Sequence, residues 1–250
     1  MNPWLRAIHL MWLLGVFVPA VVVLTTLGTL LVGPLRLLAG PARAGRWVAG
    51  SWARLLAWLT PVWVTVHGRD RVDAEHSYIV VCNHQSMYDI PVVYGFSGLD
   101  MRWVMKRELR RVPAIGIGCR MLGHIFIDRS DRRAANAAIR SAAECLDRGI
   151  GMIFFPEGTR SSSDEMLPFK LGAFRLAIEN RLPVLPMSVV GTRRILPRGR
   201  WLPRPGQARL VIHNPVATDG LVPADAAALA SQVRTIIASA RSELDANDVD

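Results

Sequence analysis

One stretch near the amino terminus restricts the folds that this chain can adopt. Residues 7–35 contain no Asp, Glu, Lys or Arg, and a run of this length exceeds the roughly 20 apolar residues that a spanning helix needs. Gly15, Pro19, Gly28 and Gly33 interrupt the run. A secretory signal has a shorter apolar region, of about 7 to 15 residues, before a small-residue cleavage site. We therefore favour a helix that stays in the protein and associates with a membrane.

A second apolar segment, residues 47–66, follows after a basic turn that contains Arg36, Arg43 and Arg46. Such a turn suits anionic headgroups. Arg54 lies in the middle of the second segment, which favours an interfacial or re-entrant helix over a spanning one. The two segments together predict a helical hairpin that dips into one leaflet or barely crosses the bilayer. The alternative is a hydrophobic hairpin buried against the rest of the protein.

Composition favours contact with a membrane over contact with nucleic acid. Six of the eight tryptophans fall within the first 63 residues, and tryptophan is enriched at membrane–water interfaces. The net charge of +10 favours anionic partners such as membrane phospholipids or a phosphorylated substrate. We expect no nucleic-acid partner, because the chain lacks a basic sheet face with interleaved aromatic residues or any other nucleic-acid-binding signature.

Three cysteines, Cys82, Cys119 and Cys145, show neither metal-ligand spacing nor an even count. Such usage is typical of a reducing compartment. We therefore place the protein at the cytoplasmic face of the cell membrane, anchored by its amino-terminal hydrophobic segment.

From residue 62 onwards, short strand-like runs alternate with helical patterns. This alternation is typical of an α/β domain with a largely parallel mixed sheet flanked by helices. We find neither a repeat nor a low-complexity linker, so we divide the chain into a membrane-associating hairpin, residues 1–61, and one α/β domain, residues 62–250. The predicted strands are 62–67, 79–82, 101–105, 124–127, 152–155, 184–190 and 209–213, and the clearest predicted helices are 131–148, 170–180 and 229–244.

A histidine and a carboxylate follow one of these runs directly. The apolar residues 78–82 end in a polar turn with His84 and Asp89, and open α/β sheets place their sites at the carboxyl ends of strands. If a helix opens near Ser86, Asp89 lies close enough to reach the imidazole. A carboxylate on one ring nitrogen fixes the tautomer and leaves the other nitrogen free to accept a proton. The pair predicts a general base; the alternative is a turn histidine capped by its neighbour.

Three other strand ends carry charged residues. The turn at residues 157–160 contains Gly158, which lets backbone N–H groups approach a ligand, and Arg160, whose planar fork suits a phosphate. Lys106, one of only two lysines, and Arg129 end two further strand-like runs. Ordinary turns and surface charge pairs are the alternatives at these positions.

These stretches, in their order and spacing, resemble the motifs of the glycerolipid acyltransferases, specifically the 1-acyl-sn-glycerol-3-phosphate acyltransferases. The resemblance covers roughly residues 62 to 215. That family is membrane-associated and transfers an acyl group from acyl-CoA or acyl-carrier protein to a hydroxyl of a lysophospholipid. The motifs that carry the resemblance are residues 83–89, 106–116, 126–129, 155–161 and 184–186.

The resemblance implies a mechanism for transfer to the sn-2 hydroxyl of 1-acyl-glycerol-3-phosphate, which gives phosphatidate. His84, oriented by Asp89, removes the hydroxyl proton as the oxygen attacks the thioester, and Lys106 is a candidate to stabilise the oxyanion. A serine nucleophile lacks its usual Gly-x-Ser-x-Gly setting. Cys82 falls within the apolar run, so we expect a core residue there rather than a thiol nucleophile.

The resemblance also implies the binding residues. Acyl-CoA or acyl-carrier protein enters as a co-substrate, and we expect no cofactor. We expect no metal either, because the other histidines lack partners at ligand spacing. The acceptor's phosphate is assigned to Glu157, Gly158, Thr159 and Arg160, with Arg129 as a second positive contact, and Pro186 is expected to shape the acyl or acceptor pocket.

Several alternatives remain open at this stage. The acceptor is lysophosphatidate by default, but another lysophospholipid, glycerol 3-phosphate or an amino-acid lipid would leave the His-Asp pair intact. A membrane-associated hydrolase would use the same pair to activate water on a thioester. A non-catalytic lipid-binding protein would keep the pocket and tolerate loss of His84. The arginine-rich stretch at residues 193–204 suits headgroups, donor phosphates or a solvated loop equally.

Overall fold

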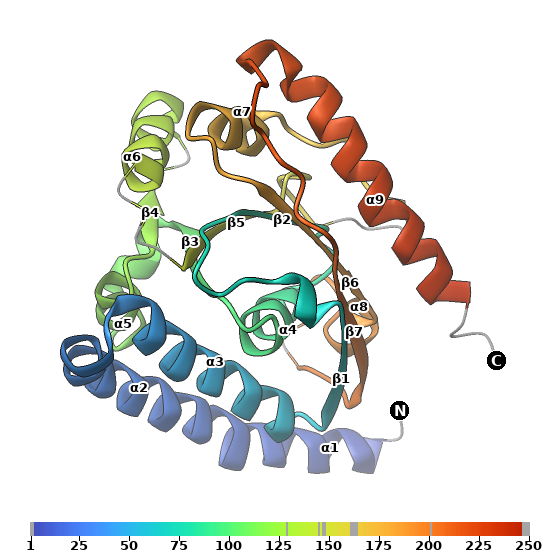
Figure 1. Ribbon diagram of the computed structural model, residues 1–250. Coiled ribbons are helices and arrows are strands. Elements are labelled where there is room, and N and C mark those ends of the chain that lie inside the picture. Colours follow the sequence, from blue (N-terminus) through green and yellow to red (C-terminus); the bar gives the residue numbers. More distant parts are fainter. Residues whose placement is uncertain are drawn as a thin grey trace.

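The computed structural model describes residues 3–128, 130–144, 146, 149–160, 165–200 and 202–246. Within them, seven strands form one sheet in the order β1-β7-β6-β2-β5-β3-β4 (Figure 1). Neighbouring strands are parallel except for the antiparallel pair β6 and β7. The α/β prediction with a largely parallel mixed sheet is confirmed. The strands are β1 (Val62–His67), β2 (Ile79–Cys82), β3 (Asp100–Lys106), β4 (Ile125–Ile127), β5 (Ile150–Phe154), β6 (Val184–Val190) and β7 (Gly206–Ile212).

Two layers of helices cover the sheet (Figure 1). Helices α3 and α4 pack on one face, while α7 and α9 pack on the other, with α6 beside α7. Strands β2 and β6 are therefore buried along their whole length, as expected for parallel strands covered on both faces. The helices of this domain are α4 (Asp89–Phe96), α5 (Ile115–Met121), α6 (Arg132–Glu144), α7 (Gly172–Glu179), α8 (Thr192–Ile195) and α9 (Ala226–Ala246), with short 3₁₀ turns at Arg69–Arg71, Arg107–Arg111 and Pro223–Asp225.

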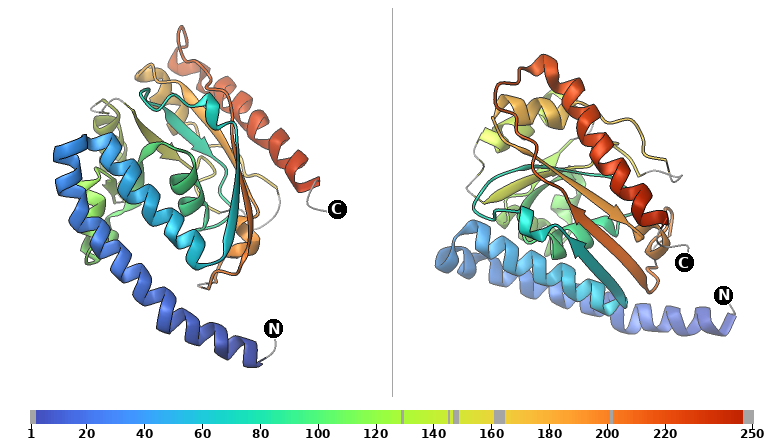
Figure 2. Two further views of the ribbon diagram at one scale, coloured as in Figure 1. Left: turned by 60° about the horizontal axis from the view of Figure 1, so that its bottom comes forward. Right: turned by 45° about the vertical axis from the view of Figure 1, so that its right-hand side comes forward.

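The amino-terminal segment forms one long helical path followed by a return helix. Helix α1 (Pro3–Trp12), a π-helical turn (Leu13–Phe17) and α2 (Val18–Ala39) run into one another, and Gly40 separates them from α3 (Pro41–Leu59). The glycines and Pro19 do not break this path, although the sequence analysis treated them as interruptions. Figure 2 shows α1 reaching well past the body of the domain.

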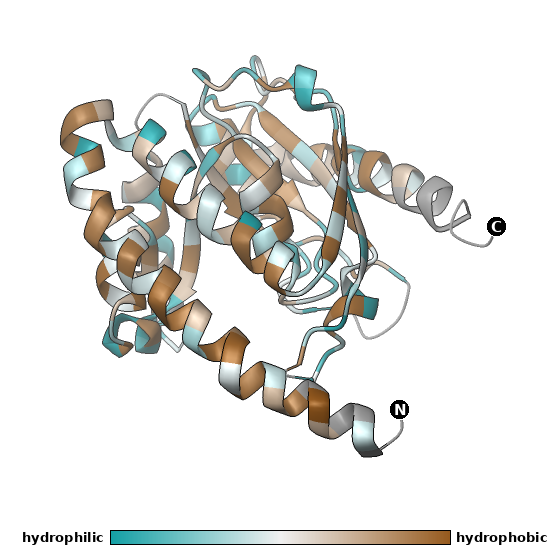
Figure 3. Ribbon diagram, turned by 90° about the horizontal axis from the view of Figure 1, so that it is seen from below, coloured by the Kyte–Doolittle hydropathy of each residue, from teal (hydrophilic) through white to brown (hydrophobic). Residues whose placement is uncertain are grey.

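Helix α2 exposes a large apolar surface. The stretch Leu10–Ala39, 30 residues long, is long and apolar enough to cross a bilayer. Leu37 is 90% exposed and Leu38 is 85% exposed, and Figure 3 shows the apolar colouring continuing along the helix. Contiguous apolar surface of this kind marks an interaction site on a folded protein.

Helix α3, in contrast, belongs to the core. Small residues, including Ala49 and Ala53, are buried on its inner face, and a Cβ on Gly95 of α4 would lie 3.1 Å from the Ala53 Cβ. Arg54 donates to the Gly95 carbonyl at 3.1 Å. Residues 62–66, which lie at the end of the second apolar segment, form part of β1 (Val62–His67), so the strand predicted at residues 62–67 is confirmed.

The predicted basic turn is also fastened to the domain. Arg36 donates to the Met121 carbonyl, and Arg46 donates to the Ala74 carbonyl at 3.3 Å. Thr29 of α2 donates to the Ala114 carbonyl at 3.1 Å. Two of the three arginines of the predicted basic turn therefore bind backbone carbonyls of the domain, whereas the sequence suggested lipid headgroups as their partners.

A buried ionic cluster lies beneath α3. Asp100, at the start of β3, accepts hydrogen bonds from Arg102 at 2.7 Å and from the Tyr94 hydroxyl at 2.9 Å. Burial raises the pKa of Asp100 and of Tyr94. The adjacent His124 is half-buried near Arg102, and its pKa falls to about 3 because desolvation and the nearby guanidinium disfavour the charged ring. A Cβ on Gly45 of α3 would meet the Asp100 carboxylate at 2.2 Å, so α3 closes the cluster.

Candidate active site

The predicted His-Asp pair forms at the carboxyl end of β2. His84 Nδ1 lies 2.8 Å from Asp89 Oδ2. Asp89 is the first residue of α4, so the helix begins three residues later than the sequence suggested. Because the carboxylate accepts from Nδ1, Nε2 keeps the lone pair that a base needs.

The Asp89 carboxylate is completely buried and has several donors. Oδ2 also accepts from the backbone N–H groups of Gln85 and Ser86 at 2.8 and 2.9 Å. Oδ1 accepts from the hydroxyl of Thr192. These donors fix the carboxylate, and through it the imidazole, in one orientation. Sequence reasoning missed Thr192, although it follows Gly191 directly at the end of β6.

The ring and the backbone of His84 are held by a second strand end. The imidazole stacks on Phe155, with ring centroids 4.0 Å apart and planes 14° from parallel, and the side chain is 14% exposed. His84 N–H donates to Glu157 Oε1 at 2.7 Å, while Glu157 Oε2 accepts from Leu167 N–H at 2.9 Å. The turn after β5 therefore positions the histidine.

Asn83 joins β2 to β6 directly before the histidine. Its amide donates to the Val189 carbonyl at 2.9 Å and accepts from the Val189 N–H at 2.8 Å. Ser86 donates to the Leu196 carbonyl at 2.7 Å. The turn thus has fixed partners on both sides, although no helix or strand ladder supports it. Its sequence, Asn-His-x-Ser, contains short polar side chains that commonly form hydrogen bonds with the backbone. This pattern could have indicated that side chains hold the turn in place.

The turn at residues 157–160 lies beside this pair. Gly158 has φ +75°, a conformation that favours glycine. Glu157 is buried and accepts from the backbone N–H groups of His84 and Leu167, and its contact with a phosphate stays a prediction. Arg160 is half-buried, and its carbonyl accepts from Arg198 at 3.3 Å.

Lys170, the second lysine, was missed by sequence reasoning. Its ammonium lies against the Gly158 turn, because a Cβ on that glycine would be 2.4 Å from Nζ. Lys170 N–H also donates to the Pro156 carbonyl at 2.9 Å. Its place directly before α7 gave no sequence signal of contact with the turn.

Three predicted site residues lie elsewhere. Lys106 is exposed at the end of β3, at the same edge as His84 but separated from β2 by β5, which corresponds to about 10 Å between strand axes. Pro186 is buried within the sheet, in register with Val81. Arg129 lies outside the described residues. The roles assigned to these three stay predictions.

Cys82 is buried beneath the site, as the sequence predicted. Burial, and then the charges of Asp89 and Glu157, raise the pKa of its thiol well above the ordinary value, which disfavours the thiolate that a nucleophile requires. Within the described part of the chain, no group of three His, Cys, Asp or Glu side chains is arranged to hold a metal ion.

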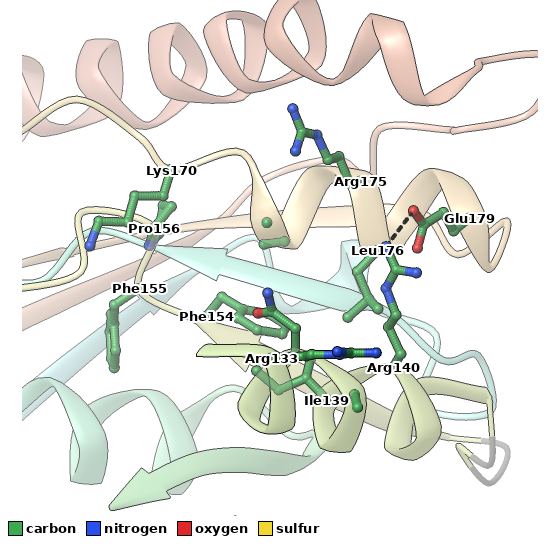
Figure 4. A pocket seen from close by; sticks show the side chains of 14 residues that line it. Arg133, Ile139, Arg140, Phe154, Phe155, Pro156, Lys170, Arg175, Leu176 and Glu179 are labelled. Atoms are coloured by element: carbon green, nitrogen blue, oxygen red, sulfur yellow. Dashed lines mark hydrogen bonds and ion pairs between the residues drawn. The ribbon is translucent and has the colours of Figure 1, made fainter. Parts of the chain in front are cut away.

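A cavity of about 740 Å³ adjoins the site between α6 and α7. Phe155 borders the cavity and stacks on His84 of the site, while Pro156 borders the cavity. Figure 4 shows its lining, with the ion pair between Arg140 and Glu179 at 3.1 Å. Arg133, Lys170 and Arg175 also line it.

Comparison with known proteins relates the chain to one family. A family model described as Acyltransferase matches residues 63–190. The chain is 34% identical over 173 residues to 1-acyl-sn-glycerol-3-phosphate acyltransferase alpha of Mus musculus, covering 68% of this chain and 61% of the relative. It is also 34% identical over 139 residues to the chloroplastic 1-acyl-sn-glycerol-3-phosphate acyltransferase BAT2 of Brassica napus, covering 55% of this chain and 40% of the relative.

A solved structure is similar over nearly the whole chain. The crystal structure of the 1-acyl-sn-glycerophosphate (LPA) acyltransferase PlsC from Thermotoga maritima matches with a TM-score of 0.69 and 28% identity, covering 90% of this chain and 96% of that one. The chain spans less than two thirds of the length of the curated relatives that it matches.

Proposed function

The chain belongs to the acyltransferase family, and from that premise we propose that it transfers an acyl group from a thioester donor to the sn-2 hydroxyl of 1-acyl-glycerol-3-phosphate, giving phosphatidate. The observation that carries the proposal is the His84–Asp89 pair, 2.8 Å apart at the carboxyl end of β2. The names of the relatives support the acceptor.

His84 acts as the general base. Nε2 takes the proton from the acceptor hydroxyl while its oxygen attacks the thioester carbonyl, and Asp89 stabilises the imidazolium that results. The tetrahedral intermediate then collapses, the carbon–sulfur bond breaks, and the imidazolium returns its proton to the leaving thiolate. A base of this kind typically contributes about 10² to 10⁴ in rate. The bond between His84 N–H and Glu157 supports the position of the imidazole.

The turn at residues 157–160 holds the acceptor's phosphate. Arg160 supplies the bidentate contact, while the backbone at Gly158 and the Thr159 hydroxyl add donors. Arg129 is the second positive contact proposed from the family resemblance. Glu157 belongs to this motif and fixes the backbone of His84 and Leu167, which orders the turn around the phosphate.

Lys106 stabilises the oxyanion in this proposal, and Pro186 shapes the acyl or acceptor pocket from within the sheet. Lys106 is exposed on the same edge as His84. Its long, flexible side chain can extend from the end of β3 toward the reacting thioester. Stabilisation requires the ammonium to come within about 3 Å of the developing charge in the complex.

The hairpin, residues 1–61, brings this site to a membrane, at the cytoplasmic face of the cell membrane, and residues 62–250 form the acyltransferase domain. The exposed apolar surface of α2 supports the placement. Because α3 of the hairpin packs on α4 of the domain, the hairpin and the domain share one core. A lipid acceptor then reaches the site without leaving the membrane interface.

The proposal is tested by acyl transfer with the purified protein in liposomes. Acyl-CoA or an acyl-carrier protein thioester is the donor and lysophosphatidate the acceptor. We expect His84→Ala to lose at least about 10² of the rate, and Arg160→Ala to recover its rate only at high acceptor concentration. His67→Ala, which removes an exposed histidine at the end of β1, is the matched control.

Two outcomes would overturn this function. Thioester hydrolysis that ignores the acceptor would identify a hydrolase. Full activity in His84→Ala would place the chemistry elsewhere. Glycerol 3-phosphate, other lysophospholipids and an amino-acid lipid, offered in parallel, identify the acceptor that gives the highest kcat/KM.

A further inference from the structure

The cavity between α6 and α7 has the lining of a site for a molecule with several phosphates. Arg133 and Arg140 are seven residues apart on α6 and therefore share one face of that helix. Lys170 and Arg175 line the opposite wall. Among the lining residues that the structure describes, Glu179 is the one acid, and it already pairs with Arg140 at 3.1 Å. The basic side chains of the lining therefore carry more positive charge than the Glu179 carboxylate can neutralise.

The floor of the cavity is apolar. Ile139, Phe154 and Leu176 lie there (Figure 4). At about 740 Å³, the cavity has the size of a small-molecule or cofactor site, which typically combines an apolar lining with a few polar groups. An apolar floor accepts a flat heterocycle, while the guanidinium forks around it accept phosphates. A simple phosphate monoester would use neither the volume nor the floor.

The cavity lies on the face of the sheet opposite to α3, the return helix of the apolar hairpin. Helices α6 and α7 lie on the opposite side of the sheet from α3 (Figure 1), so the cavity is distant from the surface of α2 that we assign to the membrane. A lipid acceptor approaches from the side of α2. A water-soluble reactant approaches from the side of α6 and α7.

The cavity and the proposed base meet at the end of β5, where Phe154 packs toward α7 and α9 and Phe155 packs toward α3 and α4. Phe155 stacks on His84 at 4.0 Å between ring centroids and also borders the cavity. The Lys170 ammonium lies against the Gly158 turn, at the boundary between the two sites. A reactant with a charged head in the cavity and a long arm would therefore bring the end of that arm past Phe155 to His84.

We propose that this cavity binds the phosphate-bearing nucleotide of a coenzyme A thioester, and thereby selects coenzyme A as the acyl donor. The adenine lies on the floor formed by Ile139, Phe154 and Leu176, and Arg133 and Arg175 bind the phosphates. Lys170 contacts the arm where it leaves the cavity for the site. This inference rests on the proposed acyl transfer and specifies the donor, with Arg133 and Arg175 as specificity-determining residues.

The test compares the double variant Arg133→Ala/Arg175→Ala with the wild-type full chain in detergent. Loss of two charge-assisted contacts raises the KM for acyl-CoA about tenfold or more, with kcat and the KM for lysophosphatidate little changed. Arg133→Lys/Arg175→Lys keeps the charge and recovers part of the loss. Arg234→Ala, which removes an exposed arginine of α9 that contacts the Met166 carbonyl at 3.0 Å, is the control on the same side of the sheet.

Two probes separate this inference from the proposed function. An S-acyl pantetheine lacks the nucleotide, so the double variant and the wild type should use it equally. Free coenzyme A should bind the wild type in calorimetry without any acceptor, and bind the double variant about tenfold more weakly. If coenzyme A binds in this way but no phosphatidate forms, the acyl transfer fails and the cavity assignment stands.

Three results would overturn the inference. Equal binding of free coenzyme A by the wild type and the double variant would remove the nucleotide from this cavity. A raised KM for lysophosphatidate alone would assign the cavity to the acceptor. Activity confined to carrier-protein thioesters and lost in the double variant would make the arginines a docking surface for an acidic protein.

Discussion

Two carboxylates, Asp89 and Asp100, are completely buried in this protein, yet their surroundings differ in kind. Asp89 accepts from a histidine, two backbone N–H groups and the Thr192 hydroxyl. Asp100 accepts from a guanidinium and a tyrosine. An imidazole can accept and release a proton during a reaction, whereas a guanidinium keeps its charge.

Access differs as well. The imidazole beside Asp89 is 14% exposed at the edge of the sheet. The cluster around Asp100 is closed by Gly45, where no larger residue fits without displacing the carboxylate. Burial alone therefore does not mark an active-site carboxylate; an imidazole partner that reaches solvent does. Four predictions test this distinction, in order of expected effect.

The largest difference is expected in activity. Asp89→Asn should lower kcat about 10³-fold, because the amide no longer stabilises the imidazolium and favours the wrong tautomer. Asp100→Asn should keep kcat within about threefold at a temperature where it is folded, because its partners do not touch the reactants. Initial rates at saturating donor and acceptor measure both. Equal losses in the two variants would remove the distinction.

The reverse order is expected for stability. Arg102→Met leaves Asp100 buried without its charged partner and should cost about 3–5 kcal/mol of unfolding free energy. His84→Asn should cost about 1 kcal/mol or less, because Asp89 keeps its backbone and Thr192 donors. Denaturant unfolding monitored by circular dichroism measures both. A greater loss in His84→Asn would make the histidine a structural residue.

A substitution at Gly45, where α3 closes the Asp100 cluster, should lower the stability by a smaller amount. Gly45→Ala places a methyl group within 2.2 Å of the Asp100 carboxylate, and overpacking of this kind costs about 1–3 kcal/mol. Gly172→Ala is the matched control, since nothing lies within 4 Å of its added Cβ. If both variants melt at the wild-type temperature, α3 does not close the cluster tightly.

The smallest effect is a change in the dependence of stability on pH. The pKa of His124 is lowered to about 3 by burial and by Arg102, so between about pH 3 and 6.5 the unfolded chain binds a proton that the folded chain does not. Stability should therefore fall as the pH falls through this window, by at most about 1.4 kcal/mol per pH unit from this group.

His124→Asn should flatten that slope. Asp100, whose pKa burial raises, acts in the opposite direction and is present in both proteins, so the difference between the slopes reports on His124. His67→Asn, at an exposed histidine, controls for the loss of a histidine as such. Parallel curves for wild type and His124→Asn would mean that water reaches this ring.

The sequence predicted the features that depend on residues close together in the chain. His84 and Asp89 are five residues apart in one turn, so their contact is local and was predicted. Strands β2 and β6 were predicted with their observed bounds, because strands buried on both faces read as uninterrupted apolar runs.

Contacts between distant segments gave no such signal. Thr192 reaches Asp89 from 103 residues away, and Lys170 meets the Gly158 turn only once the chain has folded. The sequence offered the packing of α3 in the core only as the alternative to a membrane-associated hairpin. Its buried face is built from alanine and glycine, which contribute little to apolar periodicity but allow close helix packing.

The turn after β2 has a consequence for hydrogen exchange. Three consecutive amides, those of His84, Gln85 and Ser86, donate to side-chain carboxylates of Glu157 and Asp89. Loop amides ordinarily exchange with solvent deuterium quickly, since they open without disturbing the core. These three open only if a buried carboxylate is left without its donors. Their deuterium uptake should therefore be as slow as that of the central strands, and the slow-exchanging core of the protein should extend through the loop that carries its proposed base.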